Sequence, residues 1–409
     1  MQPADSSFPL VEPRARLTPL SELQARLAGL QLALQRADLD AAIVVQNADL
    51  YYYAGTVQQA YLYVPAAGEA TLFVRKSEER ARAESALPAI VGLAAPKALP
   101  GLIEERYGGL PARLGLELDV LPVNTCRRLE KLLPGVELAD VSGAILRQRA
   151  VKSAYEIELI ERAAAVADEV CARIPGILRA GLTEAEFAGR VEAEARALGH
   201  QGVIRMRGFN QEMFYGQLLT GVSGTVATYL DTPLGGTGLS PAVAQGASFK
   251  PIGRGEPIVF DFVPVVDGYT ADFTRIFVVG SLPAELESAF AAALRVQAQV
   301  VSLARPGVTC RNLYEAAVAE AAAAGLAANF MGYGAGQVRF IGHGVGLELD
   351  ELPVLAANDL ALEPGMVFAL EPKFVLPGLG AIGIENTWCV REHGLEALTR
   401  APEKIYEVS

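Results

Sequence analysis

Two aspartates on the two arms of an expected hairpin constrain this chain more than any other feature. Residues 257–280 read PIVFDFVPVVDGYTADFTRIFVVG, in which two apolar runs flank an Asp-Gly pair. Asp-Gly supplies the positive-φ residues that a two-residue turn needs, and the flanking runs are rich in strand-forming residues. The stretch therefore predicts a β-hairpin with Asp261 on one strand and Asp272 on the other.

The register of this hairpin decides how the two acids meet. A turn centred on the Asp-Gly pair places Asp261 opposite Thr274, and the two carboxylates then share one face as diagonal neighbours at most about 7 Å apart. A turn one residue earlier would make them face each other directly. Burying two carboxylates is costly unless a cation or a metal compensates their charge. The alternative is a pair of ordinary strand-end acids, one of them bridged to Arg275.

The same arrangement recurs near the C-terminus. Residues 367–390 read VFALEPKFVLPGLGAIGIENTWCV and contain a Pro-Gly turn signal. Glu371 and Glu385 lie symmetrically about Gly378, so a hairpin that closes there pairs them across its strands. Between the two hairpins stands His343 in FIGHGVGLELDELP, one of three histidines in the chain. Four carboxylates and one imidazole suit two divalent ions such as Mn, Co, Fe or Zn.

The order and spacing of these stretches carry a family resemblance. DFVPVVDGYTADFTR, GHGVGLELDELP, PGMVFALEP and IGIENT resemble the motifs of the pita-bread metallopeptidases, which include Xaa-Pro aminopeptidases, Xaa-Pro dipeptidases (prolidases) and methionine aminopeptidases. The resemblance implies an α+β pita-bread (creatinase/aminopeptidase) catalytic domain with pseudo-twofold helix–strand repeats. It also implies a dinuclear metal centre, with Mn or Co preferred over Fe or Zn. Its five ligands would be Asp261, Asp272, His343, Glu371 and Glu385.

The resemblance implies that the chain cleaves a peptide bond, with a hydroxide that bridges two metal ions as the nucleophile. Two cations stabilise the hydroxide, and one of them polarises the scissile carbonyl. A ligand glutamate can receive the water proton and pass it to the leaving nitrogen. By resemblance, this catalytic role falls to Glu371.

The residues expected around the substrate depart from the family pattern. Seven residues after His343 the family has His-Glu, whereas this chain has Asp350-Glu351, and Ser240 stands where a histidine is usual. Loss of an oxyanion donor of this kind typically costs about 10²–10³ in rate. An aspartate donates only when protonated, but it can bind a substrate cation such as a free amine. We therefore assign Asp350 to the catalytic site as a residue that changes substrate preference.

The other two histidines are not expected to replace the missing ones. His200 follows a helix end and His393 lies in a C-terminal turn, so we predict both at the surface. Gly383 and Val375 stand where some Xaa-Pro aminopeptidases have an arginine and a tyrosine. The role of residues 227–250 is left open.

These departures keep two other functions open. One is a C–N hydrolase or lyase that acts on a small metabolite with a creatinase-like fold. The other is a binding protein, or a catalytically weak metal-binding homologue, with a vestigial site. The complete set of five ligands argues against a vestigial site, because unused buried carboxylates would destabilise the fold.

Upstream patterns predict the domain organisation. We expect a tail at residues 1–15, a smaller α/β domain at residues 16–145 and the catalytic domain at residues 146–409. The first domain resembles the creatinase/prolidase-type N-terminal domain. The second opens with a long helix, for which Ser153 is a plausible N-cap and Glu156 the partner in a capping box.

An internal repeat supports the expected fold. Gly-Leu-Thr at residues 181–183 and Gly-Val-Thr at residues 307–309 each precede a helix that ends at a glycine. Another long helix precedes each of them. A duplicated helix–helix–strand unit indicates two pseudo-symmetric halves around a shared centre.

Composition sets the remaining bounds. A hydrophobic content of 51% with 20% charged residues is ordinary for a globular enzyme, and no apolar run reaches the length of a membrane span. The four cysteines show no CxxC spacing and are expected to be reduced, and the net charge of −12 argues against nucleic acid as a partner. The N-terminus lacks the order of a signal peptide. We expect a cytoplasmic homodimer that acts on a small peptide or another small molecule, without a membrane partner.

Overall fold

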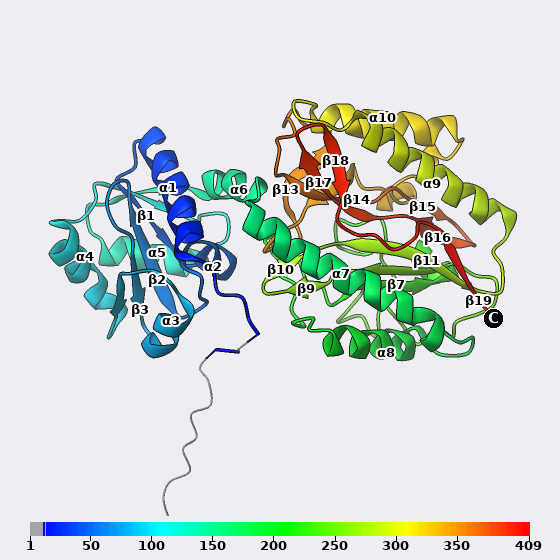
Figure 1. Cartoon of the computed structure of the whole chain (residues 1–409), viewed down its shortest axis with the longest axis horizontal. Coiled ribbons are helices and arrows are strands. Elements are labelled where there is room, and N and C mark those ends of the chain that lie inside the picture. Colours follow the sequence, from blue (N-terminus) through cyan, green and yellow to red (C-terminus); the bar gives the residue numbers. More distant parts are fainter. Residues whose placement is uncertain (1–10, 13) are drawn as a thin grey trace, which may run out of the picture. The chain divides into compact units, whose positions relative to one another are not determined.

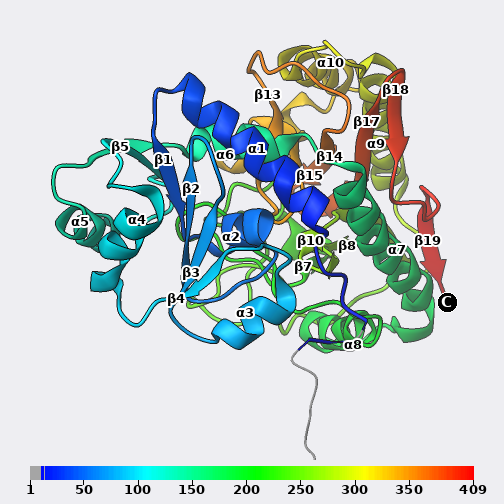
Figure 2. The same ribbon diagram turned by 60° about the vertical axis from the view of Figure 1, so that its left-hand side comes forward.

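The computed structural model describes residues 11–12 and 14–409, so most of the predicted tail at residues 1–15 lies outside the described residues. The chain divides into two compact units, residues 1–148 and 149–409. Figures 1 and 2 show the helices and strands of both units.

The first unit is a six-stranded sheet with helices packed on it. The strand order is β4-β3-β2-β1-β5-β6, in which β1–β2 and β2–β3 are antiparallel and the other pairs are parallel. Helix α1 buries a stripe of four leucines, Leu23, Leu27, Leu30 and Leu34, and all four residues of β1 are buried. The strands are β1 (Ala41–Val44), β2 (Ala60–Pro65), β3 (Thr71–Val74), β4 (Ile90–Gly92), β5 (Arg113–Leu116) and β6 (Glu137–Asp140). The helices are α1 (Leu20–Arg36), α2 (Asn47–Ala54), α3 (Glu78–Glu84), α4 (Leu99–Tyr107), α5 (Val123–Leu132) and α6 (Ser142–Ala150), the last of which contains the division between the units.

The second unit contains two larger sheets and two short hairpins. One sheet has the order β19-β11-β8-β7 and the other the order β13-β12-β14-β17-β18, while β9–β10 and β15–β16 form the hairpins. In Figure 1, helices α8 and α10 lie on opposite sides of these strands. The helices are α7 (Ala154–Ile177), α8 (Glu184–Ala197), α9 (Ala284–Leu303) and α10 (Cys310–Ala323). The strands are β7 (Gly216–Thr220), β8 (Ile258–Phe262), β9 (Val265–Val266), β10 (Tyr269–Thr270), β11 (Phe273–Val279), β12 (Phe340–Gly344), β13 (Glu351–Ala356), β14 (Val367–Leu370), β15 (Lys373–Leu376), β16 (Gly380–Gly383), β17 (Asn386–Arg391), β18 (Gly394–Ala397) and β19 (Ile405–Val408).

The predicted repeat is present in the helix starts. Thr183 caps α8 and Thr309 caps α10, each by accepting a backbone N–H in the first turn. In both halves the glycine two residues before the cap donates its N–H at 2.9 Å to a distant carbonyl, that of Ile252 in one half and Leu362 in the other. Each half therefore anchors its second helix in the same way, as pseudo-twofold symmetry requires.

The first hairpin adopts the register expected for a turn at the Asp-Gly pair. Asp267 and Gly268 both have positive φ, 48° and 88°, which is the geometry that Asp-Gly favours in a two-residue turn. Asp261 of β8 pairs with Thr274 of β11, so the alternative register one residue earlier is not adopted. The two aspartates are diagonal neighbours.

The second hairpin closes at Gly378, which has a φ of 81°. Strands β15 and β16 pair Lys373 with Gly383. Two residues beyond this pair, the same register aligns Glu371 with Glu385, as predicted. This hairpin connects β14 to β17, so both glutamates lie at the end of the five-stranded sheet.

Candidate metal centre

The five predicted ligands come together where the two larger sheets of the second unit meet. Asp261 lies on β8 and Asp272 directly precedes β11 of the four-stranded sheet, whereas β12, β14 and β17 of the five-stranded sheet carry or flank the other three ligands. An isolated β-bridge between Thr274 and Glu385 joins the sheets beside the centre. The ligands all line one cavity of about 540 Å³; they are Asp261, Asp272, His343, Glu371 and Glu385.

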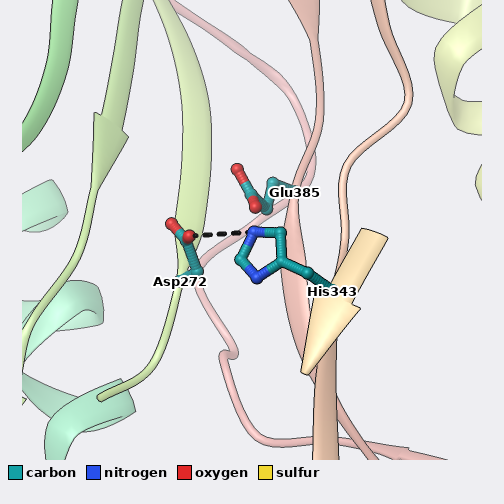
Figure 3. Close-up of side chains that lie close together, drawn as sticks. All are labelled: Asp272, His343 and Glu385. Atoms are coloured by element: carbon teal, nitrogen blue, oxygen red, sulfur yellow. Dashed lines mark ion pairs between the residues drawn. The ribbon is translucent and has the colours of Figure 1, made fainter. Parts of the chain in front are cut away.

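Three of these side chains form a group that could hold a metal ion. Asp272, His343 and Glu385 each offer a ligand atom, and these atoms lie within 4.8 Å of one another (Figure 3). Nε2 of His343 lies 3.6 Å from Oδ2 of Asp272 and 3.6 Å from Oε1 of Glu371. Imidazole nitrogen and carboxylate oxygen bind Zn²⁺ at about 2.0–2.2 Å, so small side-chain movements would close the group around an ion.

Hydrogen bonds to neighbouring threonines hold two of the acids in place. The hydroxyl of Thr274 donates to Oε2 of Glu385 at 2.7 Å. The hydroxyl of Thr387 accepts the backbone N–H of Asp272 at 2.8 Å and donates to the backbone carbonyl of the same residue at 2.9 Å. Thr387 lies on β17 of the five-stranded sheet. This pair of bonds therefore holds Asp272 against that strand, which begins directly after Glu385.

A buried lysine that the sequence analysis did not predict lies inside the cluster. The ammonium of Lys373 lies 3.0 Å from Oδ2 of Asp261, 2.7 Å from Oε2 of Glu371 and 2.7 Å from Oε2 of Glu385. Lys373 is only 2% exposed. The signal was available in the sequence, because residues two apart on a strand point to the same face, and Lys373 follows Glu371 by two residues.

The strand opposite Lys373 leaves room for its side chain. Gly383 pairs with Lys373 across the hairpin, and a Cβ at position 383 would lie 2.7 Å from Cγ of Lys373. Any larger residue at position 383 would therefore displace the lysine stem. Gly383, one of the departures from the family pattern, therefore leaves room for the lysine side chain.

Burial and mutual repulsion disturb the ionisation of the cluster when no metal is bound. Burial raises the pKa of Asp261 to about 6, against the lowering effect of the Lys373 ammonium. Burial and the charge of Glu385 raise the pKa of Asp272 well above its usual range. Burial alone would lower the pKa of Lys373, but Asp261 and Glu371 together with the other acids raise it well above its usual value. Asp261 and Asp272 therefore depend on a cation to remain ionised.

Asp350 lines the same cavity but has partners of its own. Its Oδ1 accepts the backbone N–H of Arg207 at 2.8 Å and its Oδ2 accepts that of Gly208 at 3.0 Å. Asp350 therefore fixes the segment at residues 205–208 beside the cavity. Three residues of the segment 227–250, whose role the sequence left open, also line the cavity. They are Leu230, Asp231 and Thr232.

The prediction that His200 lies at the surface is wrong. Its side chain is 2% exposed, and its ring stacks on Tyr215 with the ring centres 4.4 Å apart. Nδ1 accepts the N–H of Gly202 at 2.8 Å, so Nε2 carries the proton that is donated to the carbonyl of Val263 at 2.9 Å. The side chain of His200 points into the interior and not into solvent because these two backbone groups bind both ring nitrogens. His393 is exposed, as predicted.

Comparison with known proteins agrees with this fold. The model of metallopeptidase family M24 matches residues 158–392, and that of the creatinase/prolidase N-terminal domain matches residues 26–151. The chain belongs to metallopeptidase family M24. The predicted fold, a pita-bread catalytic domain preceded by a smaller creatinase/prolidase-type domain, is confirmed.

Similar proteins cover nearly the whole chain. An Xaa-Pro dipeptidase of Pyrococcus horikoshii is 29% identical over 378 residues, which span 91% of this chain and 96% of that protein. The crystal structure of dipeptidase PepE from Mycobacterium ulcerans has a TM-score of 0.78 at 27% identity and covers 96% of this chain and 100% of its own. The Xaa-Pro dipeptidase from Bacillus anthracis shares the fold with a TM-score of 0.81 at 23% identity, over 94% of this chain and 100% of its own.

Proposed function

We propose that the chain is a metal-dependent hydrolase that cleaves the peptide bond of a small peptide, in the manner of an Xaa-Pro dipeptidase or aminopeptidase with an altered substrate site. The observation that carries this proposal is the group formed by Asp272, His343 and Glu385 at the wall of a cavity of about 540 Å³. A cavity of this size suits a ligand of a few residues. Family membership favours this function over the metabolite-hydrolase and vestigial-site alternatives.

The ion proposed for this group is Mn²⁺ or Co²⁺, with Fe²⁺ and Zn²⁺ as alternatives that accept the same nitrogen and oxygen ligands. Bound there, a divalent ion would polarise a scissile carbonyl and lower the pKa of a water. Asp272, His343 and Glu385 would hold it. The five ligands by themselves predict two ions, but three of the oxygens that a second ion needs contact Lys373.

Glu371 is the residue proposed to move the proton. Its Oε2 is bound to the Lys373 ammonium at 2.7 Å, whereas its Oε1 is the oxygen nearer to His343 Nε2, at 3.6 Å. Glu371 lines the cavity, and its Oε1 can accept a proton from an attacking water and return it to the leaving nitrogen. Lys373 would hold the carboxylate in a fixed orientation for this transfer.

Charged residues at the cavity indicate how a peptide would be oriented. Arg339 lines the cavity and is exposed, so its guanidinium can bind the carboxylate end of a dipeptide. Asp231 and Asp350 line the same cavity and supply negative charge for the free amine. We propose Asp350 as a residue of the catalytic site that acts in this way, either directly or through the segment whose backbone it binds.

Hydrolysis of a peptide panel tests the proposal. The protein is reconstituted with Mn²⁺ or Co²⁺ and offered dipeptides and tripeptides, including Xaa-Pro sequences, with and without a chelator. We expect cleavage that the chelator abolishes and that Asp272→Asn lacks. A protein that binds metal but leaves the whole panel intact would contradict the proposal and direct the search to small C–N metabolites.

We also propose that the protein is a cytoplasmic homodimer without a nucleic-acid or membrane partner. The four cysteines are unpaired in the structure, and the chain carries a net charge of −12. In the part of the chain that the structure describes, no helix combines the length and apolar character needed to cross a membrane. Light scattering coupled to size-exclusion chromatography would test the dimer, with a single-chain mass as the contrary result.

A further inference from the structure

The Lys373 ammonium uses all of its donors on the metal cluster. An ammonium group has three N–H donors. Three carboxylates from both sheets, those of Asp261, Glu371 and Glu385, lie within 2.7–3.0 Å of its nitrogen. The nitrogen therefore takes the position of a cation shared by three predicted metal ligands.

Two glutamates contact Lys373, and the two oxygens of one of them, Glu371, lie near different groups of the cluster. Oε2 of Glu371 and Oε2 of Glu385 both accept from Lys373. Oε1 of Glu371 is instead the oxygen 3.6 Å from His343. Asp272, His343 and Glu385 form the candidate metal group, and Asp261 is not a member of it. The cluster thus has an ammonium side and a metal side that share the carboxylate of Glu385.

A second divalent ion would compete with the ammonium for the same oxygens. It would need the oxygens of Asp261 and Glu385 at roughly 2.0–2.2 Å, and these oxygens already surround the lysine nitrogen. The four carboxylates carry four negative charges, which one divalent ion and one ammonium nearly balance. Two divalent ions beside the ammonium would leave an excess of one positive charge, which is equal in size to the single negative charge left by one ion. The contacts of Lys373 with the shared oxygens, and not the charge balance, therefore argue against a second ion.

The lysine is also held in place along its length. It is 2% exposed, and its backbone carbonyl accepts the N–H of Met331 at 2.8 Å. Its stem passes over Gly383, where no side chain competes for the space. Displacing the ammonium would break three charge-assisted hydrogen bonds and leave a buried cation without a partner.

We infer that Lys373 replaces one of the two metal ions for which the five-ligand pattern is suited, so that each chain binds a single divalent ion at Asp272, His343 and Glu385. This inference rests on the proposed function for the use of that ion, but its geometry is independent of the substrate. It predicts that the protein keeps the fold of a dinuclear hydrolase but binds one metal ion fewer per chain.

Metal content tests the inference without any measurement of activity. The purified protein is saturated with Mn²⁺, freed of excess ion, and analysed by inductively coupled plasma mass spectrometry and electron paramagnetic resonance. We expect about one Mn²⁺ per chain with the spectrum of an isolated ion. Two ions per chain with a spin-coupled spectrum would overturn the inference, and so would a wild-type chain that retains no ion.

Lys373→Gly provides the complementary test. Removing the ammonium and its stem frees three carboxylates, so this variant is expected to bind two Mn²⁺ per chain and to show the spin-coupled spectrum. The matched control is Lys250→Gly, which removes a lysine that bridges Glu256 at 2.7 Å outside the cavity and should leave the count at one. A folded Lys373→Gly variant that still binds one ion would overturn the inference.

Folding of Lys373→Gly is monitored by circular dichroism with and without Mn²⁺. Four buried carboxylates without the ammonium repel one another, so the variant is expected to melt below the wild type in chelator and to recover in Mn²⁺ by a larger increase in Tm. If this variant does not fold, the wild-type count and spectrum still decide between one ion and two.

The peptide panel separates this inference from the proposed function. One ion per wild-type chain without peptide cleavage would remove the proposed function and support the role of Lys373. Two coupled ions with cleavage would support the function and overturn the inference.

Discussion

The ammonium of Lys373 lies 2.7 Å from the carboxylate of Glu385, a residue that also belongs to the candidate metal group. The two residues come from the two arms of one hairpin, and Gly383 provides the space between them. A protein cation and a metal ion would therefore share a carboxylate in the same buried cluster. This relationship makes metal content, and not the family motif alone, the property to measure first.

Removing the imidazole should weaken the metal site strongly. His343→Ala takes away the one nitrogen ligand of the three-residue group, and we expect Mn²⁺ affinity to fall by more than about 100-fold, beyond the usual effect of changing a neighbour of a ligand. The measurement is titration of metal-free protein with Mn²⁺ by calorimetry. His393→Ala, which alters an exposed histidine, is the control and should bind as the wild type does. Equal affinity of both variants would contradict the assigned ligand.

The hydroxyl of Thr274 should increase the metal affinity of the site by holding Glu385 in position. Thr274→Val removes the 2.7 Å hydrogen bond to Oε2 while keeping the shape of the side chain. Loss of such an orienting bond typically lowers metal affinity by about 10–100-fold. Thr274→Ser retains the hydroxyl and should recover most of the affinity in the same titration. If valine and serine bind Mn²⁺ equally well, Thr274 does not position the ligand.

Arg339 should affect substrate binding and not metal binding. Losing a charge-assisted bond to a substrate carboxylate costs about 1.5–3 kcal/mol, so Arg339→Ala should raise KM for a cleaved dipeptide by roughly 10- to 100-fold. A dipeptide amide, which lacks that charge, should lose little. The control is Arg305→Ala, an exposed arginine that does not line the cavity. An equal loss on the acid and the amide would exclude carboxylate recognition.

Stability should fall in acid because of a buried ion cluster outside the metal centre. Burial alone would raise the pKa of Glu351, but Arg149 and Lys152 lower it to about 2, against an ordinary value of 4.5. A carboxyl whose pKa is lower in the folded chain stabilises it above pH 4.5, and this contribution is lost as the pH falls from about 4.5 to about 2.

Glu351→Gln isolates this contribution. At pH 7 it should lower the free energy of unfolding by about 3 kcal/mol, since each pKa unit is worth about 1.4 kcal/mol. The difference from the wild type in urea unfolding should shrink below pH 4.5. Glu407→Gln changes an exposed carboxyl and should follow the wild type at every pH. A difference that stays constant down to pH 3 would show that the ion pairs do not cause it.

Sequence patterns predicted the parts of the site that depend on chain geometry. Asp267-Gly268 and Gly378 fix the two turns, and alternation along the strands then brings each pair of acids together, whatever the rest of the fold does. The repeated Gly-Xaa-Thr starts likewise gave the two helix pairs. These features are local, so a few residues determine them.

Features that depend on tertiary contacts were not predicted. Lys373 is a different case, because its place two residues after Glu371 and opposite Gly383 in the expected hairpin was available in the sequence but was not used. His200 was expected outside because it follows a helix end, yet both ring nitrogens find backbone partners inside. The backbone bonds of Asp350 to residues 207 and 208 join segments more than a hundred residues apart, which no local pattern reveals.

Anomalous X-ray diffraction from crystals of the Mn²⁺-saturated wild-type protein tests the account most directly. We predict one strong anomalous peak per chain, bounded by Asp272, His343 and Glu385, with density for the Lys373 side chain continuing to Asp261. Two peaks a few ångströms apart, with the lysine turned out of the cluster, would contradict it.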